Sequence, residues 1–481
     1  GFLLAAFHFT QVAQGNTGTV RDFAERTALA LADAEEPVEI VLLEASDRFG
    51  GVMRSFKWGE ILCEEGPDSL VRTKPASIEL CERLGVELVP TLPSTGGALI
   101  AKGDRLLPLP DGFMLLAPAR FLPFVKTDHV SWLGKARMGL DLLLPRGEYD
   151  DDEDVSLAEF VRRRLGQEAL ERLAQPLVAG IYSGDPERLS VRATMPDLLM
   201  LEQKHRSLTL GMRARSKARP DAKASGARYG LFRTPKDGMA AIADAVVQEL
   251  QGKAELRTGA GVLGIERRAE GWTVRLTGEA LEVDGVILAT PHPVAAGFLE
   301  PHAAPVAEAL RGIRTSSTAT LNLLFPKSAF SRGLPKGNGF VVPAVEEGRT
   351  LMACTFASNK YPGRGDDEHF LLRGFIGGEL GRDAFALDDD ALIAGALADL
   401  FTLVGVVGQP SRVHLRRWTN AQPQYELGHR GRVTRIDAGL AQLDGVELAG
   451  NAFHGVGLGN VVVEGRAAAE RLLASWGGDH E

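Results

Sequence analysis

The sequence predicts a mixed α/β fold organised around an open parallel sheet. Three short runs, residues 38–43, 285–290 and 446–450, are apolar and continuous. Parallel strands that are covered on both faces usually have this composition. Each run ends in small or turn-forming residues, and open α/β sheets bind their ligands beyond the carboxyl ends of such strands. We therefore expect a ligand site where these runs end.

Size and charge limit the architecture and the partners. A chain of 481 residues is too long for one core, so two or three domains are expected. The net charge of −9 argues against a nucleic-acid surface, which requires clustered Lys and Arg. The one basic tract, residues 204–223, is interpreted as a solvated loop or helix face. No run of about 18 apolar residues occurs, so no transmembrane helix is predicted.

The three cysteines, Cys63, Cys81 and Cys354, indicate a reducing compartment. Their odd number and the absence of C-x-x-C spacing fit neither a disulfide framework nor a zinc site. We expect no metal site and a cytoplasmic location. The apolar opening, residues 1–9, lacks a basic region and a cleavage site, and it is not expected to be a signal peptide.

Local signals predict further helices and strands. Ser156 and Glu159 form a capping box that is expected to open a helix. The acidic run 150–154 is interpreted as complementing the positive end of that helix. Residues 237–251 have helical spacing, and residues 255–281 alternate as antiparallel strands do.

A Leu-, Phe- and Pro-rich stretch occupies residues 106–144. It predicts a packed helical lobe, and a surface lobe that touches lipid is the alternative.

Residues 44–51, EASDRFGG, form the sharpest local motif. A carboxylate at the end of a strand, such as Glu44, can accept hydrogen bonds from both ribose hydroxyls of an adenosine. Arg48 follows, and Gly50 and Gly51 allow backbone N–H groups to approach a pyrophosphate. The pattern favours a dinucleotide site over the alternative, a strand that ends in a turn with a surface ion pair.

A Rossmann-like dinucleotide site also requires a strand, a G-x-G-x-x-G turn and a helix upstream. Residues 13–18 read A-x-G-x-x-G, because Ala13 replaces the first glycine. Gly15 can still admit the pyrophosphate, and Gly18 can still permit close packing of helix on strand. Residues 19–23 are bulky and charged where small residues would pack. The segment is therefore expected to be an impaired site, or a stretch altered by a reading-frame change.

An ordered set of motifs extends over the rest of the chain. It comprises residues 65–69 (EGPDS), 180–185 (GIYSGD), 202–208 (EQKHRSL), 423–425 (PQY) and 450–458 (GNAFHGVGL). Together with the motif at residues 44–51, this set resembles the protoporphyrinogen/coproporphyrinogen oxidase family of amine-oxidase-like flavoproteins. The resemblance begins near residue 38 and reaches the C-terminus, and the order and spacing are more specific than any single motif.

The resemblance implies a mixed α/β and α+β fold with three parts. A Rossmann-like FAD-binding domain would be discontinuous, comprising residues 1–56, 228–298 and 414–481. A substrate-binding domain on a mixed sheet would comprise residues 57–108 and 299–413. A helical lobe would comprise residues 109–227.

The resemblance also implies that FAD is the cofactor, held largely by backbone groups. The residues expected to contact its adenosine and pyrophosphate are Gly15, Gly18, Glu44, Ala45, Arg48, Gly50 and Gly51. Those expected to pass close to the flavin are Gly66, Pro67, Asp68 and Ser69. Those expected to close over the flavin and ribityl chain are Gly450, Asn451, Gly455, Val456, Gly457 and Leu458. Trp418 would lie nearby, and Val262 would offer its backbone to the adenine.

The activity implied is oxidation of coproporphyrinogen III or protoporphyrinogen IX to the porphyrin in haem synthesis. A hydride would pass to flavin N5, and O2 would be the usual acceptor. Because the flavin carries the chemistry, no acid–base residue is expected, and no hydrolase or zinc-protease motif occurs. The candidates for the substrate cavity are Gly180, Ile181, Tyr182 and Asn338.

Several alternatives stay open. One is an amine-oxidase- or desaturase-like flavoenzyme, which an aromatic content of only 6% disfavours. Another is a non-catalytic porphyrin-binding relative with an impaired FAD site. Asn338 stands where plant-type relatives carry a substrate-clamping aromatic residue, so the partners of the propionates are not assigned. Peripheral contact with the inner face of the cell membrane and a homodimer are further hypotheses.

Overall fold

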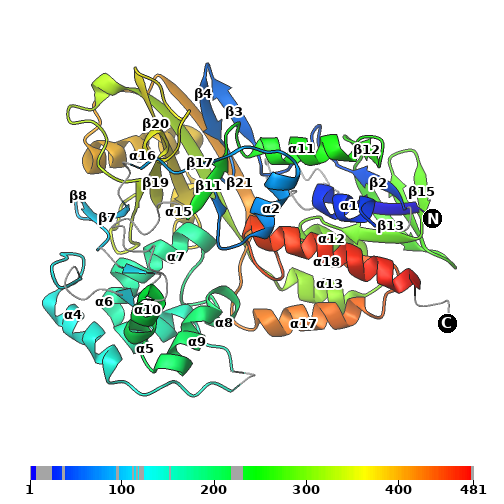
Figure 1. Ribbon diagram of the computed structural model, residues 1–481, viewed down its shortest axis with the longest axis horizontal. Helices are drawn as coiled ribbons and strands as arrows, with labels where there is room; N and C mark the ends of the chain where they lie inside the picture. The colour runs from blue at the N-terminus through cyan, green and yellow to red at the C-terminus, as the bar shows by residue number, and fades with distance from the viewer. Residues whose placement is uncertain are drawn as a thin grey trace.

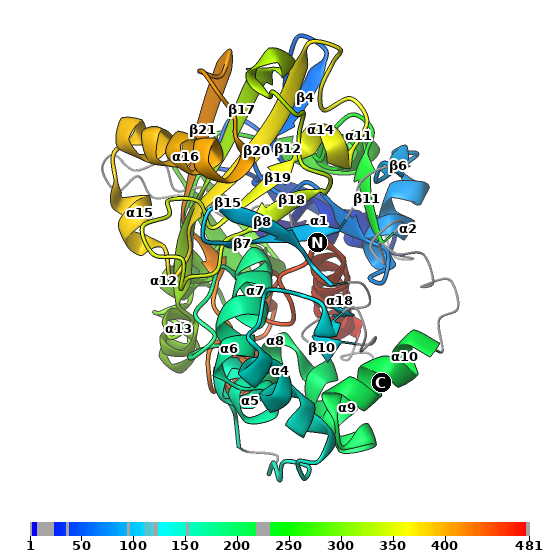
Figure 2. The ribbon, with the colours of Figure 1, turned by 90° about the vertical axis from the view of Figure 1, so that its left-hand side faces the viewer.

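The computed structural model describes residues 2–6, 24–34, 38–93, 97–110, 113–114, 117–118, 124–150, 153–217 and 231–477. Ala13, Gly15 and Gly18 lie outside the described residues, and so do residues 218–223 of the basic tract. Figure 1 shows a parallel sheet with its helices on the right and a larger sheet on the left. The helical lobe lies below the larger sheet in both Figure 1 and Figure 2.

The parallel sheet contains all three predicted apolar strands. Its order is β12 (Glu255–Arg257), β2 (Glu39–Leu43), β1 (Phe2–Ala6), β16 (Gly285–Leu288) and β22 (Val446–Leu448), and every pairing is parallel. Successive residues of a strand point to opposite faces, and here both faces are covered. Ile40 and Leu42 enter one core, whereas Val41 and Leu43 enter the other. This double burial explains why the runs are continuously apolar.

Helices and a small sheet cover the two faces. On the face of Leu42 lie α1 (Ala24–Ala32), α11 (Ala240–Leu250) and α18 (Leu458–Gly477). On the face of Leu43 lie α12 (His292–Leu299), α13 (Ala304–Arg311), α17 (His429–Leu440) and an antiparallel sheet of β13 (Val262–Arg267), β14 (Trp272–Leu276) and β15 (Ala280–Val283). The predicted helix at residues 237–251 is confirmed as α11. The predicted antiparallel run is correct for β13 to β15 but wrong for β12, which joins the parallel sheet because it pairs with β2.

The larger sheet has seven strands and is mixed, as expected for the substrate domain. Its order is β21 (Arg412–Pro423), β17 (Thr315–Pro326), β20 (His369–Gly377), β19 (Ala353–Phe356), β18 (Gly339–Val341), β7 (Ala98–Lys102) and β8 (Arg105–Pro108). Only β18 and β7 pair in parallel. The helix α16 (Asp389–Val404) covers one face and buries Leu392, Ala396 and Leu400 in its core.

Short elements connect the two sheets. They are the hairpin β3 (Ser55–Trp58) and β4 (Ile61–Glu64), the sheet of β5 (Leu70–Val71), β11 (Phe232–Pro235) and β6 (Leu88–Pro90), and the pair β9 (Phe113–Met114) and β10 (Ala117–Pro118). The remaining ones are α2 (Ala76–Arg83), α14 (Ala357–Lys360), α15 (Arg382–Ala386) and the 3-10 turn η4 (Lys327–Ala329).

The helical lobe has a core of its own. Its elements are α4 (Trp132–Gly139), η1 (Leu140–Leu142), α5 (Leu157–Leu165), α6 (Gln167–Ala169), η2 (Leu170–Ala174), α7 (Gln175–Tyr182), α8 (Val191–Thr194), α9 (Pro196–His205) and α10 (Leu208–Lys217). The predicted capping box is confirmed, because the Ser156 hydroxyl accepts a hydrogen bond from the Glu159 N–H at 3.0 Å.

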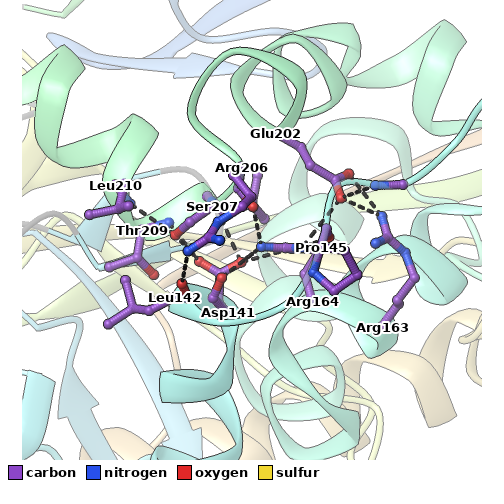
Figure 3. Close-up of polar contacts among 12 residues, drawn as sticks. Asp141, Leu142, Pro145, Arg163, Arg164, Glu202, Arg206, Ser207, Thr209 and Leu210 are labelled. Atoms are coloured by element: carbon purple, nitrogen blue, oxygen red, sulfur yellow. Dashed lines mark hydrogen bonds and ion pairs between the residues drawn. The ribbon is translucent and has the colours of Figure 1, made fainter.

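A buried ionic network holds this lobe together (Figure 3). Arg164 and its partners Asp141 and Glu202 have no solvent exposure. The Arg164 guanidinium donates to Asp141 Oδ1 at 2.8 Å and to the Arg206 carbonyl at 2.7 Å. Asp141 also accepts from Ser207 Oγ at 2.6 Å and from the Thr209 N–H at 2.9 Å, which caps α10. The motif at residues 202–208 therefore has a structural role in joining α5, η1, α9 and α10.

Asp154, the last residue of the acidic run, makes tertiary contacts, and the predicted interaction of the run with the positive end of α5 stays a prediction. Asp154 accepts hydrogen bonds from Ser190 Oγ at 2.7 Å and from the Gly428 N–H at 2.8 Å. Its carboxylate therefore joins the lobe to Gly428, the residue that precedes α17. The contact between Asp154 and Gly428 is a tertiary one, since the two residues are distant in the sequence.

The division into three domains stays a proposal, and sheet membership refines it. Strand β21 pairs with β17 in the seven-stranded sheet although residues 414–423 were expected in the FAD-binding domain. Helices α12 and α13 pack on the parallel sheet although residues 299–311 were expected in the substrate domain. We therefore propose moving these two boundaries to about residue 313 and about residue 424.

Candidate functional site

The described strands of the parallel sheet end at one edge, because they all run in the same direction. Glu44 directly follows β2 and is buried. Its Oε1 accepts a hydrogen bond from the Ser46 N–H at 2.6 Å. The Ala260 N–H donates to the Glu44 carbonyl at 2.9 Å, which places Val262, at the start of β13, close by. The structure thus places Glu44, Ala45 and Val262, three of the expected cofactor contacts, close to one another.

The turn after β2 adopts a backbone that only glycine adopts readily. Gly50 and Gly51 have φ angles of +93° and +49°. A side chain at Gly50 would lie 2.6 Å from Ala243 Cβ on α11. Arg48 stabilises the turn itself, because its Nη2 donates to the Met53 carbonyl at 3.1 Å. The N–H of the buried Gly51 has no acceptor within the described part of the chain, so it suits a bound anion.

The segment Gly66–Ser69 packs tightly beneath this turn. A Cβ at Gly66 would lie 1.9 Å from the Val52 carbonyl oxygen, so no other residue fits there. The preceding carbonyl of Glu65 accepts hydrogen bonds from Trp418 Nε1 at 3.0 Å and from Thr320 Oγ1 at 2.7 Å. Trp418 therefore positions this segment from β21.

Asp68 belongs to a buried ionic cluster that sequence reasoning missed. Lys360 Nζ lies 2.9 Å from both carboxylate oxygens of Asp68, and Ser69 Oγ donates to Oδ1 at 2.7 Å. Arg373 donates to the Gly66 carbonyl and lies 3.8 Å from Asp68. The Asp68 and Ser69 side chains and the Gly66 carbonyl are thus engaged with protein groups.

The charges of this cluster are unequal. Burial opposes ionisation of Asp68, but Lys360 and Arg373 outweigh it and hold the pKa of this carboxyl well below its usual range. Burial raises the pKa of Glu64 to about 7, although Ser55 and Arg364 bind it. Two cations, Lys360 and Arg373, therefore face the firmly ionised Asp68, whereas Arg364 faces Glu64. Arg373 is 3% exposed, and among the described residues its Nε has no hydrogen-bond partner.

No sequence signal could have found this cluster. Lys360 lies on α14 and Arg373 on β20, about 300 positions after Asp68. Spacing carries no information at such a separation, and only the fold brings these charges together.

The segment after β22 closes the same edge of the sheet. Gly450 and Asn451 begin a turn, and the 20-residue helix α18 starts at Leu458. Among the described residues no acceptor meets the N–H groups of Val456, Gly457 and Leu458. These donors lie at the positive end of a long helix and suit an anionic or electron-rich ligand.

The substrate-cavity candidates lie on two adjacent elements. Gly180 and Ile181 are exposed at the end of α7, and Ile181 is 53% exposed. Tyr182 is buried, and its hydroxyl donates to the Thr194 carbonyl at 2.8 Å, so it has a structural role. Val341 of β18 packs against the core that contains α7, which brings the segment of Asn338 beside that helix. The Asn338 Oδ1 is buried and has no partner within the described residues.

The described residues contain no group of three or more His, Cys, Asp or Glu side chains arranged to hold a metal.

Comparison with known proteins gives consistent results. The family described as flavin containing amine oxidoreductase matches residues 27–473. The coproporphyrinogen III oxidase of Bacillus subtilis (strain 168) is 32% identical over 97% of this chain and 98% of its own length. The protoporphyrinogen oxidase of Bos taurus is 30% identical over 92% of this chain and 95% of its own length. A crystal structure of an Exiguobacterium sp. 255-15 protein assigned as a protoporphyrinogen oxidase superposes with a TM-score of 0.84, at 28% identity over 98% of both chains.

Proposed function

This chain belongs to the protoporphyrinogen/coproporphyrinogen oxidase branch of the flavin-containing amine oxidoreductases, and we propose that it is an FAD-dependent enzyme that oxidises a porphyrinogen to the porphyrin in haem biosynthesis. The observation that carries the proposal is the set of backbone N–H donors at Gly51 and at residues 456–458. They lie at the edge where the parallel strands end, which is where open α/β sheets hold their ligands.

The residues at this edge fit FAD. The Glu44 carboxylate stands at the end of β2, where a ribose would bind. The N–H of Gly51 would face the pyrophosphate, and the start of α18 would face the electron-rich N1 side of the flavin. Gly15 and Gly18 remain proposed contacts, and Ala13→Gly is expected to raise FAD affinity if that loop cradles the pyrophosphate.

When FAD is bound, its flavin supplies the redox chemistry by accepting a hydride at N5. The protein orients the substrate and encloses the reacting atoms. The segment Gly66–Ser69 is held from below by Trp418 and Arg373, and the turn at residues 450–455 covers the same edge. Lys360 and Arg373 keep the Asp68 carboxylate ionised, and their contacts fix the segment that contains Gly66 and Ser69. The Asn338 amide, on the wall beside α7, is a proposed substrate contact.

Turnover of two substrates tests the proposal. Purified protein with added FAD is expected to convert coproporphyrinogen III or protoporphyrinogen IX into its fluorescent porphyrin. Comparing the two rates identifies the substrate, and measuring oxygen uptake tests O2 as the acceptor. A yellow protein that oxidises neither substrate would contradict the proposed activity. A colourless protein that resists loading with FAD would support the non-catalytic alternative.

An exposed apolar surface on the helical lobe supports a second proposal, peripheral binding to an anionic membrane. Trp132, Leu133 and Leu143 are 72%, 84% and 73% exposed. A neighbouring cavity of about 380 Å³ is lined by Lys102, Arg105 and Lys135, among others. Apolar side chains beside cations are typical of a surface that lies on anionic lipid. No helix among the described residues is long and apolar enough to cross a membrane.

Vesicle sedimentation tests this second proposal. The protein is expected to sediment with phosphatidylglycerol vesicles, and the double variant Trp132→Ser/Leu133→Ser is expected to lose this binding. Phe401→Ser is the matched control, because Phe401 is 62% exposed on α16 of the other domain. Equal sedimentation of the double variant and wild type would exclude this surface.

A homodimer is a further proposal. Strand β21 pairs only with β17 among the described strands, so its outer edge can bind a second chain. Sedimentation velocity at micromolar concentration distinguishes a dimer from a monomer.

A further inference from the structure

The turn at residues 451–455 is held at both ends by one hydroxyl group. The Tyr425 hydroxyl donates a hydrogen bond to the Asn451 carbonyl at 2.6 Å. The same oxygen accepts one from the Gly455 N–H at 2.8 Å. Both the donor and the acceptor capacity of the hydroxyl are therefore used to close this turn.

The Tyr425 ring is fixed in place by its surroundings. It is 1% exposed, and it stacks on His429 with 4.0 Å between ring centroids and 13° between ring planes. His429 Nε2 lies 3.1 Å from the Phe453 carbonyl oxygen. Two stacked rings thus bind three backbone groups of a five-residue turn. Such a pair leaves the turn a single conformation, because moving one ring would break contacts of the other.

The last residue of this turn, Gly455, leads directly to the ligand-facing donors. Gly455 has a φ of +141°, and a Cβ there would lie 2.3 Å from Asn460 Nδ2. The conformation is unfavourable for any residue other than glycine, and the space there is already filled by Asn460. The unpartnered N–H groups of Val456, Gly457 and Leu458 follow at once. The orientation of those donors depends on Gly455, and Gly455 depends on Tyr425.

Tyr425 is also joined to the wall of the proposed substrate cavity. The neighbouring Gln424 donates from Nε2 to the Tyr182 carbonyl at the end of α7, at 2.9 Å. The Ser190 N–H donates to the Tyr425 carbonyl at 2.8 Å. Tyr425 therefore lies where the seven-stranded sheet, the helical lobe and the segment leading to α18 meet.

We propose that Tyr425 is a positioning residue for the flavin, because its hydroxyl sets the turn that aims the backbone donors of residues 456–458. This inference rests on the proposed FAD site and adds a residue that does not itself touch the cofactor. His429 supports the Tyr425 ring and the Phe453 carbonyl, and Gln424 ties the assembly to α7.

The test compares FAD binding and the flavin spectrum in Tyr425→Phe and wild type. The variant keeps the stacked ring and loses two hydrogen bonds to the turn. Each such bond contributes modestly, so the dissociation constant for FAD is expected to rise about tenfold or more. At saturating FAD, the visible absorbance band of the bound flavin is expected to shift, because the donors near N1 are displaced.

Tyr149→Phe is the matched control. It also removes a hydroxyl contact, the part-buried one from Tyr149 to Glu202 at 2.7 Å, but in the helical lobe. Its FAD affinity and flavin spectrum are expected to equal those of wild type. If Tyr425→Phe does not fold, His429→Phe is the second variant. This substitution keeps the ring stacked on Tyr425 and removes only the contact with the Phe453 carbonyl. The expected loss of FAD affinity is smaller than for Tyr425→Phe.

The outcomes separate this inference from the proposed function. Wild type that binds FAD while Tyr425→Phe shows the same affinity and spectrum overturns the role of Tyr425 alone, and an unchanged His429→Phe overturns only the supporting role of His429. Wild type that binds no FAD overturns the proposed function and the inference with it. A raised dissociation constant and an altered spectrum, with Tyr149→Phe unchanged, support the inference.

Discussion

At the scale of single residues, the site depends on charges that the fold places together. Asp68, Lys360 and Arg373 come from a loop, a short helix and a strand, and they surround the segment Gly66–Ser69. Glu64, next to them, is 3% exposed and has its pKa raised to about 7 by burial. One carboxyl of the cluster thus remains ionised, whereas the other changes its charge near neutral pH.

Glu64 is expected to make stability depend on pH. Its pKa rises from 4.5 in the unfolded chain to about 7 in the folded protein, so the folded state binds this proton more tightly. The stabilisation is present below about pH 4.5 and is lost as pH rises through 7. The loss is on the order of 3 kcal/mol, since one pKa unit corresponds to about 1.4 kcal/mol and the pKa rises from 4.5 to about 7.

Urea denaturation between pH 4.5 and pH 8 measures this effect. In Glu64→Gln the side chain cannot ionise, and the decline in unfolding free energy over this interval is expected to be smaller than in wild type. Parallel curves for the two proteins would show that Glu64 does not titrate in this range.

At the scale of elements, caps and alternating burial explain where helices and strands form. Strand β2 sends successive side chains into two cores. Helix α5 begins where the Ser156 hydroxyl replaces a missing helical acceptor. These features are local, and the sequence pattern predicts them for that reason.

Removing the cap of α5 is expected to destabilise the protein. Ser156→Ala leaves the Glu159 N–H without its acceptor, and the expected loss is about 1 kcal/mol of unfolding free energy. Ser411→Ala is the control, because Ser411 is exposed and its hydroxyl forms no hydrogen bond among the described residues. Chemical denaturation of both variants checks this, and equal losses would contradict the role of the cap.

At the scale of the whole molecule, buried polar groups join parts that are distant in sequence. Gln424 and Tyr425 connect the seven-stranded sheet to the lobe and to the turn before α18. Arg164, Asp141 and Glu202 hold the lobe itself (Figure 3). Removing one partner of such a network leaves a buried charge uncompensated and is costly.

Arg164→Met is expected to loosen the lobe and spare the parallel sheet. It leaves Asp141 and Glu202 buried with less positive charge, and the expected cost is about 3–5 kcal/mol. Hydrogen exchange is expected to accelerate in α5, α9 and α10, whereas β2, β16 and β22 stay protected. Uniform acceleration across both regions would show that the network stabilises the whole chain.

The sequence by itself determined the features that depend on neighbouring residues. These are the apolar strands of the parallel sheet, the cap of α5, the glycine turn after Glu44 and the ordered motifs that indicate the family. They are readable because strand period, capping and glycine conformations are local properties.

The tertiary structure alone decided which distant groups meet. Asp68 forms an ion pair with Lys360, and β12 pairs with β2 in the parallel sheet. Asp154 accepts a hydrogen bond from Gly428, and the Tyr425 hydroxyl lies between Asn451 and Gly455. The physical reason is that such contacts are set by how sheets and helices pack, and sequence spacing does not encode packing across hundreds of residues.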